Sequence, residues 1–312
     1  MLKKIICLFS CFSLFLPLFA QKASIRLGVL KGISCAPCAY LIENKEKLAV
    51  QNISFQIFDS AQAELPKLLR GEIDMGFLTP EDAAKVFTAG KGALLMAGLV
   101  QNGGLYLLTN DELYVSLENL QEKNIFISEK DSSKIPLLKS LITKKEGEED
   151  GSGESFHFDF SLPLASIANK LIIGEAEYAL LSEPFATVAL KNSSKLIRAE
   201  NIQQVYMEKE NGNTIPSMIL VVRVAFADEN HDLVRQFLEV YRSGLQWTNS
   251  NHAKAAMLIE KHKLGLSQAV ARDSIANASL VFRTAPSAKS DIEKYLTILG
   301  RELPAEEFYF AP

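Results

Sequence analysis

Residues 24–41 read SIRLGVLKGISCAPCAYL. Apolar residues alternate along 25–29 and predict a strand, residues 31–34 predict a turn, and a helical pattern resumes near Ala36. A helix that begins just after a strand and a tight turn presents free backbone N–H groups and the positive end of its dipole. We therefore interpret this turn as one wall of a solute-binding cleft. An ordinary strand-to-helix connection is the alternative.

The composition of the chain narrows the class of protein. Its 312 residues are 48% hydrophobic and 22% charged, which is enough to bury a core and to form two domains. The net charge is −4, and no basic block follows the first few residues. Nucleic acid is therefore not expected as a partner.

The N-terminus predicts export. Met1–Lys4 is short and cationic, residues 5–19 are apolar with Pro17 near their end, and Ala20 precedes polar residues. This pattern predicts a signal peptide at residues 1–20, with a mature protein in the periplasm or at the extracytoplasmic face. An uncleaved membrane anchor, which would leave the protein membrane-associated, is the alternative. No later run is long and apolar enough to span a bilayer.

Strand and helix patterns alternate along the chain and predict two mainly parallel α/β units. We expect a turn at residues 101–104, a strand from the apolar pairs at 196–197 and 205–206, and helices from His231 onward. Residues 70–80 and 173–184 form a weak repeat, in which a Gly-acidic turn precedes a strand that ends in a small hydroxyl residue near proline. Two similar lobes would bring strand ends and helix starts together at the cleft between them.

Four segments, in this order, resemble the substrate-binding proteins of bacterial ABC importers. They are Leu30–Gly32 before a helix, Leu69–Asp74, Leu117–Ile125 and Gly174–Phe185. The most similar branch is the nitrate/sulfonate/taurine type, which includes binders of thiamine-pyrimidine and riboflavin precursors. The resemblance covers nearly all of the mature chain, although no single motif in it is specific.

The resemblance implies a two-lobe, type II periplasmic-binding-protein-like α/β fold. Two crossover strands would form its hinge, a helical C-terminal tail would follow, and the lobes would close on a ligand. We assign residues 22–106 plus 217–312 to lobe 1 and residues 107–216 to lobe 2. The implied partners are a small-molecule ligand, an ABC permease and its ATPase, and we expect a monomer without a cofactor. A sensor that feeds a signalling partner would look the same in sequence.

The resemblance also implies which residues face the cleft. Two departures stand out: Ile33–Cys38 replaces a Gly-Pro-Thr-like run, which leaves ligand identity open, and Asn119–Lys123 lacks the usual glycine. As the ligand we expect, in order of preference, a heterocyclic vitamin precursor, a small oxyanion such as a sulfonate, or an amino-acid-like compound. The expected ligand-binding residues are Lys31, Gly32, Ile33, Ser34, Thr79, Gln101, Asn102, Ser132, Ser133 and Glu183.

Several of these residues have simpler interpretations. Thr79, Ser132 and Ser133 are candidate helix caps, and Glu183 stands at a helix start. Glu81 and Asp82 put negative charge at the Thr79 helix, which argues against a strongly anionic ligand there. If two of the aromatic residues face the cleft instead of the core, a planar heterocycle becomes the better ligand. The aromatic residues considered are Tyr40, Phe77, Tyr106 and Phe185.

Cys35-Ala36-Pro37-Cys38 suggests a second function. A C-x-P-C at a helix start after a strand resembles thioredoxin active sites, where the helix dipole activates the first cysteine. An exported thiol-disulfide oxidoreductase is therefore the alternative to a binding protein, and a structural disulfide or two packed thiols is the plainer interpretation. Our hypothesis is a disulfide between Cys35 and Cys38 that clamps the binding turn. The four histidines are scattered and suggest no metal site, and hydrolase and nucleotide-binding motifs are absent from the sequence. We accordingly expect no enzymatic activity.

Overall fold

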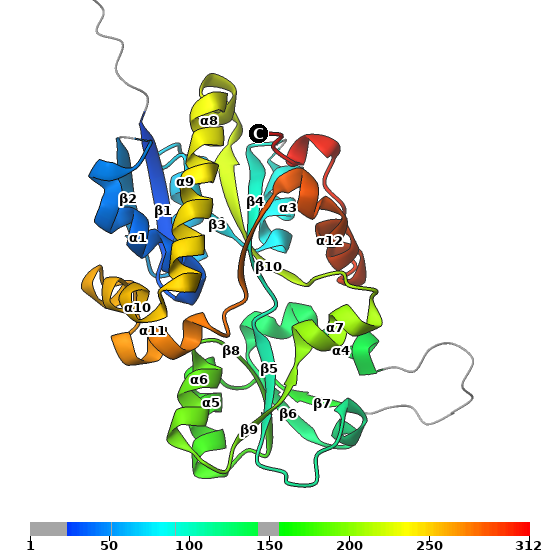
Figure 1. Cartoon of the computed structure of the whole chain (residues 1–312). Coiled ribbons are helices and arrows are strands. Elements are labelled where there is room, and N and C mark those ends of the chain that lie inside the picture. Colours follow the sequence, from blue (N-terminus) through cyan, green and yellow to red (C-terminus); the bar gives the residue numbers. More distant parts are fainter. Residues whose placement is uncertain (1–23, 51, 91, 143–155) are drawn as a thin grey trace, which may run out of the picture.

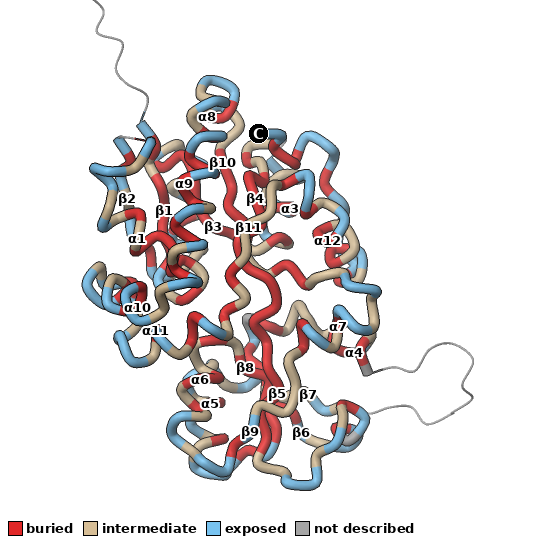
Figure 2. The backbone as a smooth tube through the Cα atoms, in the orientation of Figure 1, coloured by how far each residue is buried: buried red, intermediate tan, exposed pale blue. Residues whose placement is uncertain are grey.

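The computed structural model describes residues 24–50, 52–90, 92–142 and 156–312, so the expected signal peptide lies outside the described residues. These residues form two α/β lobes, each built on one mixed sheet with helices on its faces (Figure 1). Buried residues run through the strands of both sheets, and the exposed residues lie mostly on the helices and loops around them (Figure 2). The expected two-lobe α/β architecture is confirmed.

The first sheet has six strands in the order β11-β4-β10-β3-β1-β2. β1 pairs in parallel with β2 and β3, whereas β10 runs antiparallel to β3 and β4, and β11 antiparallel to β4. The expectation of a mainly parallel sheet was therefore wrong, because the returning strand β10 enters the middle of the sheet. The bounds are β1 (Ile25–Leu30), β2 (Ile53–Phe58), β3 (Met75–Leu78), β4 (Leu94–Asn102), β10 (Pro216–Arg223) and β11 (Leu280–Thr284).

The second sheet has five strands in the order β7-β6-β8-β5-β9. Strand β5, between β8 and β9, is buried on both faces: Leu105 and Leu107 belong to one core cluster, and Tyr106 and Leu108 belong to another. The bounds are β5 (Leu105–Thr109), β6 (Asn124–Ile127), β7 (His157–Asp159), β8 (Tyr178–Ser182) and β9 (Ile197–Asn201).

Helices cover both sheets. α1 and α9 pack against each other beside the first sheet, and α3 and α12 pack against β4. The helices are α1 (Ala36–Asn44), α2 (Ala61–Leu69), α3 (Pro80–Ala89), α4 (Ile135–Ile142), α5 (Leu164–Ile173), α6 (Phe185–Asn192), α7 (Ile202–Lys209), α8 (Val224–Glu229), α9 (His231–Ser250), α10 (His252–Lys261), α11 (Gln268–Ile275) and α12 (Ala285–Ile298), with short 3-10 helices η1 (Ile33–Cys35), η2 (Lys45–Lys47), η3 (Leu117–Leu120), η4 (Glu129–Lys134) and η5 (Glu306–Phe308).

Three local expectations were wrong. Val205 and Tyr206 lie in α7, because Asn201 Oδ1 accepts a hydrogen bond from the Gln203 amide and starts a helix there. Residues 101 and 102 continue β4, since β10 pairs with that strand as far as Pro216 and Asn102. The C-terminal tail is mainly helical but contains β11, which extends the edge of the first sheet.

The chain passes between the two sheets at one narrow place. It leaves β4 at Asn102, enters β5 at Leu105, and returns to the first sheet ahead of Pro216. The two crossings are joined by a hydrogen bond from the Gly103 amide to the Ile215 carbonyl, 2.7 Å long. Gly103 has φ +54°, and a Cβ there would lie 2.6 Å from Gln203 Cβ. We expect these two crossings, held together by this hydrogen bond, to act as the hinge.

The last long helix connects the lobes a further time. Ala285, Ala288, Ile292 and Leu296 of α12 join the core of the first lobe. Tyr295 on the same helix, with Leu299 just after it, joins one core of the second lobe. The C-terminal tail therefore packs on both lobes, not only on the first.

An unusual carboxyl group lies inside the first lobe. Glu64 of α2 is fully buried, and its Oε2 accepts a hydrogen bond from the Phe77 amide at 3.1 Å. A Cβ at Gly28 or Gly76 would lie 2.1 or 2.7 Å from Glu64 Oε1, so these glycines make room for the side chain. The pairing of β1 with β3 is limited to Leu27 and Met75. The Glu64 side chain thus accepts the hydrogen bond of a β3 backbone amide that has no strand partner in β1.

Burial raises the pKa of Glu64 to about 8, while an unfolded glutamate has a pKa near ~4.3. Between these two pH values the folded protein keeps a proton that the unfolded chain releases. The free energy of unfolding therefore falls by up to about 1.4 kcal/mol for each unit by which the pH rises. Glu64→Gln should remove this slope in urea unfolding measured from pH 5 to 9. Identical pH dependence in the variant and the wild type would refute the assignment.

Candidate functional site

The expected site residues cluster at the carboxyl ends of neighbouring strands. In the first lobe, residues 31–34 follow β1 and Thr79 follows β3. In the second lobe, η4 with Ser132 and Ser133 follows β6, and Glu183 follows β8, which pairs in parallel with β6. These are the positions where open α/β sheets bind ligands.

The turn after β1 is held from two sides. The Gly32 amide donates to the Leu264 carbonyl at 2.9 Å, and Lys31 Nζ lies 2.6 Å from a carboxylate oxygen of exposed Asp59. Ile33 is buried in the core of the lobe, whereas Ser34 is partly exposed. Gly32 and Ser34 are therefore more accessible to a solute than Ile33.

The start of α3 meets the second lobe. Thr79 caps this helix, because its hydroxyl accepts from the Asp82 amide at 3.2 Å. Ser133 Oγ lies 3.5 Å from Glu81 Oε1 and brings η4 against α3. Burial raises the pKa of the Glu81 carboxyl, and the ammonium of Lys134, 2.6 Å from Asp131, acts against that rise. The expected cap and the expected second-lobe serines thus lie at one boundary.

Amide side chains line the hinge. Gln101 Nε2 donates to the Ala278 carbonyl at 2.8 Å, and the backbone N–H of Asn102 donates to the Ser279 carbonyl. Two buried amide atoms have no hydrogen-bond partner within the described residues: Asn102 Oδ1 and Gln203 Nε2. Gln203 was not expected from sequence. Buried polar groups are normally paired, so these atoms suit a ligand or water.

Glu183 forms a buried ion pair. Its side chain is 1% exposed, and Oε1 accepts from Arg198 Nη2 at 2.8 Å while Oε2 accepts from the Thr187 amide. The Arg198 guanidinium lies 3.9 Å from the centre of the Tyr106 ring, whose hydroxyl donates to the Asn277 carbonyl of the first lobe. Arg198 Nη1 is buried without a partner in the described structure. The sequence offered no distinctive signal for Arg198, because the strand that holds it, Ile197–Asn201, also carries Glu200.

We expect Arg198→Met to lower the free energy of unfolding by about 3 kcal/mol, because it leaves the buried Glu183 carboxylate unpaired. Adding Glu183→Gln to this variant should restore part of the loss, which urea unfolding of the single and double variants would measure. The prediction is contradicted if the free energy of unfolding of Arg198→Met lies within about 0.5 kcal/mol of the wild type. A change of that size is typical of an ordinary surface substitution.

A cavity of about 310 Å³ opens at the carboxyl ends of β6 and β7. It is lined by Ser128 and Glu129 at the start of η4 and by residues 160–164 ahead of α5. The Ser128 hydroxyl donates to an Asp131 carboxylate oxygen at 2.9 Å at the start of η4. Ser132 and Ser133, the serines expected to bind ligand, lie later in η4 and are not among the residues that line this cavity.

The aromatic residues divide between core and boundary. Phe77 is fully buried against Tyr241, with ring centres 5.9 Å apart, and Tyr40 packs on Trp247 at 4.7 Å. Phe185 packs beside a core cluster of the second lobe. Tyr106 differs, because its hydroxyl bonds to the other lobe. Only Tyr106 among these four has a contact that favours a position at the boundary.

The two cysteines are not arranged for redox chemistry. Cys35 and Cys38 are free thiols with no exposed surface. Burial, followed by the neighbouring Cys38 thiol, raises the pKa of Cys35 well above its usual value. A nucleophilic thiol needs a lowered pKa and solvent access, so the oxidoreductase alternative is not favoured.

In the reduced, folded protein, we expect Cys35 and Cys38 to resist alkylation at neutral pH, because neither thiol is accessible. Both should react once denaturant unfolds the chain, as mass spectrometry would count. Insulin reduction by the wild type should match that by Cys35→Ser. Rapid labelling of the folded protein, together with turnover lost in the variant, would restore the enzymatic alternative.

Within the described ranges, no group of three or more His, Cys, Asp or Glu side chains is placed to hold a metal ion. In that same part of the chain, no helix has both the length and the apolar character needed to cross a membrane.

Solved structures share this fold. An ABC transporter protein from Parabacteroides distasonis superposes with a TM-score of 0.74 at 19% identity, over 92% of this chain and 98% of its own. The periplasmic aliphatic sulphonate binding protein SsuA from Escherichia coli gives 0.69 at 15%, over 93% and 92%. The periplasmic nitrate-binding protein NrtA from Synechocystis gives 0.54 at 14%, over 88% and 80%. No family model and no curated protein sequence matches the chain.

These similarities identify the architecture. The chain has the periplasmic binding protein fold. The likeness covers about nine-tenths of the chain and includes both lobes, so it is not limited to one α/β unit. At identities below 20%, it leaves the ligand of this protein to be argued from its own residues.

Proposed function

We propose that this protein is an extracytoplasmic solute-binding component of an ABC-type importer, in the nitrate/sulfonate/taurine-like branch. It captures a small molecule between its two lobes and delivers it to a membrane permease. The observation that carries the proposal is the binding-protein fold over more than 90% of the chain, shared with an ABC transporter protein and a periplasmic sulphonate binding protein. The expected signal peptide is consistent with this location.

The polar atoms at the lobe boundary support a small, mostly neutral ligand with both donors and acceptors. Asn102 Oδ1 is an acceptor without a partner, whereas Gln203 Nε2 and Arg198 Nη1 are donors without partners in the described residues. The Glu81 carboxyl at the start of α3 disfavours a strong anion at that helix. A heterocycle such as a vitamin precursor is therefore the first choice, ahead of a small oxyanion or an amino-acid-like compound.

Thermal unfolding with a panel of compounds tests this proposal. A solute at 100 times its dissociation constant stabilises the folded state by about 2.7 kcal/mol, which raises the midpoint by about 5 °C. The panel contains hydroxymethylpyrimidine, a riboflavin precursor, taurine, nitrate and single amino acids. We expect a shift with at least one compound, largest for a heterocycle.

Asn102→Ala should reduce that shift, because it removes the unpartnered acceptor at the hinge. Asn192→Ala is the matched control, since Asn192 is exposed and donates only to Val188 of its own helix among the bonds described. If every compound class leaves the midpoint unchanged, a solute receptor of this kind is excluded. If the shift persists in Asn102→Ala, the solute lies elsewhere than the hinge.

A further inference from the structure

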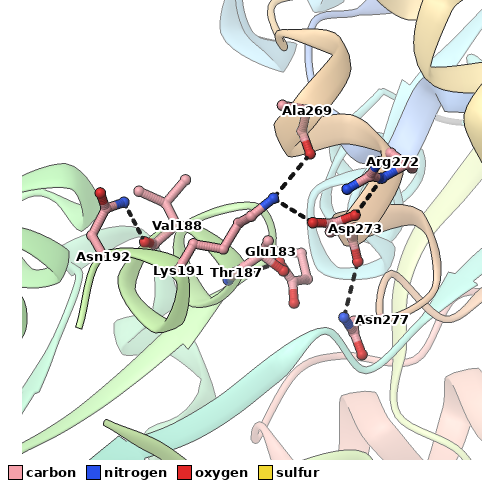
Figure 3. A network of polar contacts seen from close by, with 9 residues as sticks. All are labelled: Glu183, Thr187, Val188, Lys191, Asn192, Ala269, Arg272, Asp273 and Asn277. Carbon is pink, nitrogen blue, oxygen red and sulfur yellow. Dashed lines mark hydrogen bonds and ion pairs between the residues drawn. The ribbon is translucent and has the colours of Figure 1, made fainter. Parts of the chain in front are cut away.

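A polar contact joins the lobes through helices α6 and α11. Lys191 lies in the last turn of α6 in the second lobe, and its ammonium contacts the Asp273 carboxylate on α11 of the first lobe (Figure 3). The same Nζ lies 3.4 Å from the Ala269 carbonyl, also on α11. One side chain of the second lobe thus meets two acceptors on one helix of the first.

The Asp273 carboxylate is held in place from its own lobe. Arg272 Nε donates to Oδ1 at 2.7 Å, and Asn277 Nδ2 donates to the Asp273 backbone carbonyl at 3.1 Å. The Asn277 carbonyl in turn accepts from the Tyr106 hydroxyl of the second lobe. The end of α11 is therefore fixed against both α6 and β5.

The ion pair between Lys191 and Asp273 is partly exposed, so its contribution to the open–closed equilibrium is expected to be small. The Lys191 and Asp273 side chains are 40% and 33% exposed, so water and salt reach both charges. Exposed ion pairs of this kind change an equilibrium by roughly 1.5- to 5-fold. Hydrogen bonds from Arg272 and Lys191 lower the pKa of Asp273 to about 2, so salt is a better variable than pH for testing the pair.

We propose that the contact of Lys191 with Asp273 and the Ala269 carbonyl is a clasp that holds the two lobes together before any solute binds. The clasp sets the fraction of protein that is open to admit solute. This inference uses the proposed function only to name the solute. A solute that enters only the open form has its apparent affinity reduced in proportion to the open fraction, so the clasp would tune the apparent affinity.

Fluorescence energy transfer between the lobes, without solute, tests the clasp. Met257→Cys on α10 and Ile173→Cys on α5 provide exposed attachment sites in the two lobes, 55% and 56% exposed, while Cys35 and Cys38 are buried. Lys191→Gln should raise the open-to-closed ratio about two- to fivefold at low salt. Molar salt should open the wild type to the same extent and leave the variant unchanged.

The controls separate the clasp from general effects. Lys170→Gln removes a lysine whose ion pair with Glu175, 2.9 Å, stays within the second lobe, and it should behave like the wild type. Asp273→Asn combined with Lys191→Gln should open the protein no further than Lys191→Gln alone. A closed fraction that responds to neither Lys191→Gln nor salt, or that responds equally to Lys170→Gln, would overturn the clasp. Because no solute is present, these results do not depend on the outcome of the compound panel.

Discussion

The hydrogen bond from the Gly103 amide to the Ile215 carbonyl, 2.7 Å long, joins both crossings of the chain between the sheets. Gln203 strengthens this point, because its Oε1 accepts from the Ile215 amide at 2.9 Å while its side chain packs against Gly103. Two covalent connections held at one place allow the lobes to rotate but not to slide far. The carboxyl ends of the parallel strands in both sheets are therefore kept on either side of one boundary.

Charge at this boundary is balanced mostly within each lobe. Glu183 is neutralised by Arg198, and Asp131 by Lys134. What remains unmatched are single donors and acceptors, such as Arg198 Nη1 and Asn102 Oδ1. Unpaired buried groups of this kind are costly unless a partner arrives, which is the physical basis for expecting a solute with several hydrogen-bonding atoms.

Local signals in the sequence predicted much of the fold. The strand, turn and helix of residues 25–44 and the Thr79 cap depend on neighbours in sequence, and both are present. α7 was missed because the prediction used only the apolar pairs at 196–197 and 205–206 and left out Ile202, which lies four residues before Tyr206 on the same helix. The hinge turn was placed too early because Asn102 suggests a turn, although pairing with β10 keeps it in a strand.

The site was less predictable, because its partners are distant in sequence. Glu183 was expected at the boundary, but its ion pair with Arg198 depends on β9 lying two strands from β8. The contact of Tyr106 with Asn277 spans 171 residues and needs both lobes in place. No local pattern encodes such pairs, and the helix start with two cysteines suggested a chemistry that burial prevents.

Hydrogen–deuterium exchange of the protein, with and without the solute that stabilises it most, tests the central claim directly. Solute held between the lobes should slow amide exchange in residues 79–84, 128–135 and 183–187 together, because these segments lie on the two sides of one boundary. Slowing confined to residues 87–90, 92–95 and 224–231, which contribute to cavities at the other end of the first lobe, would contradict it.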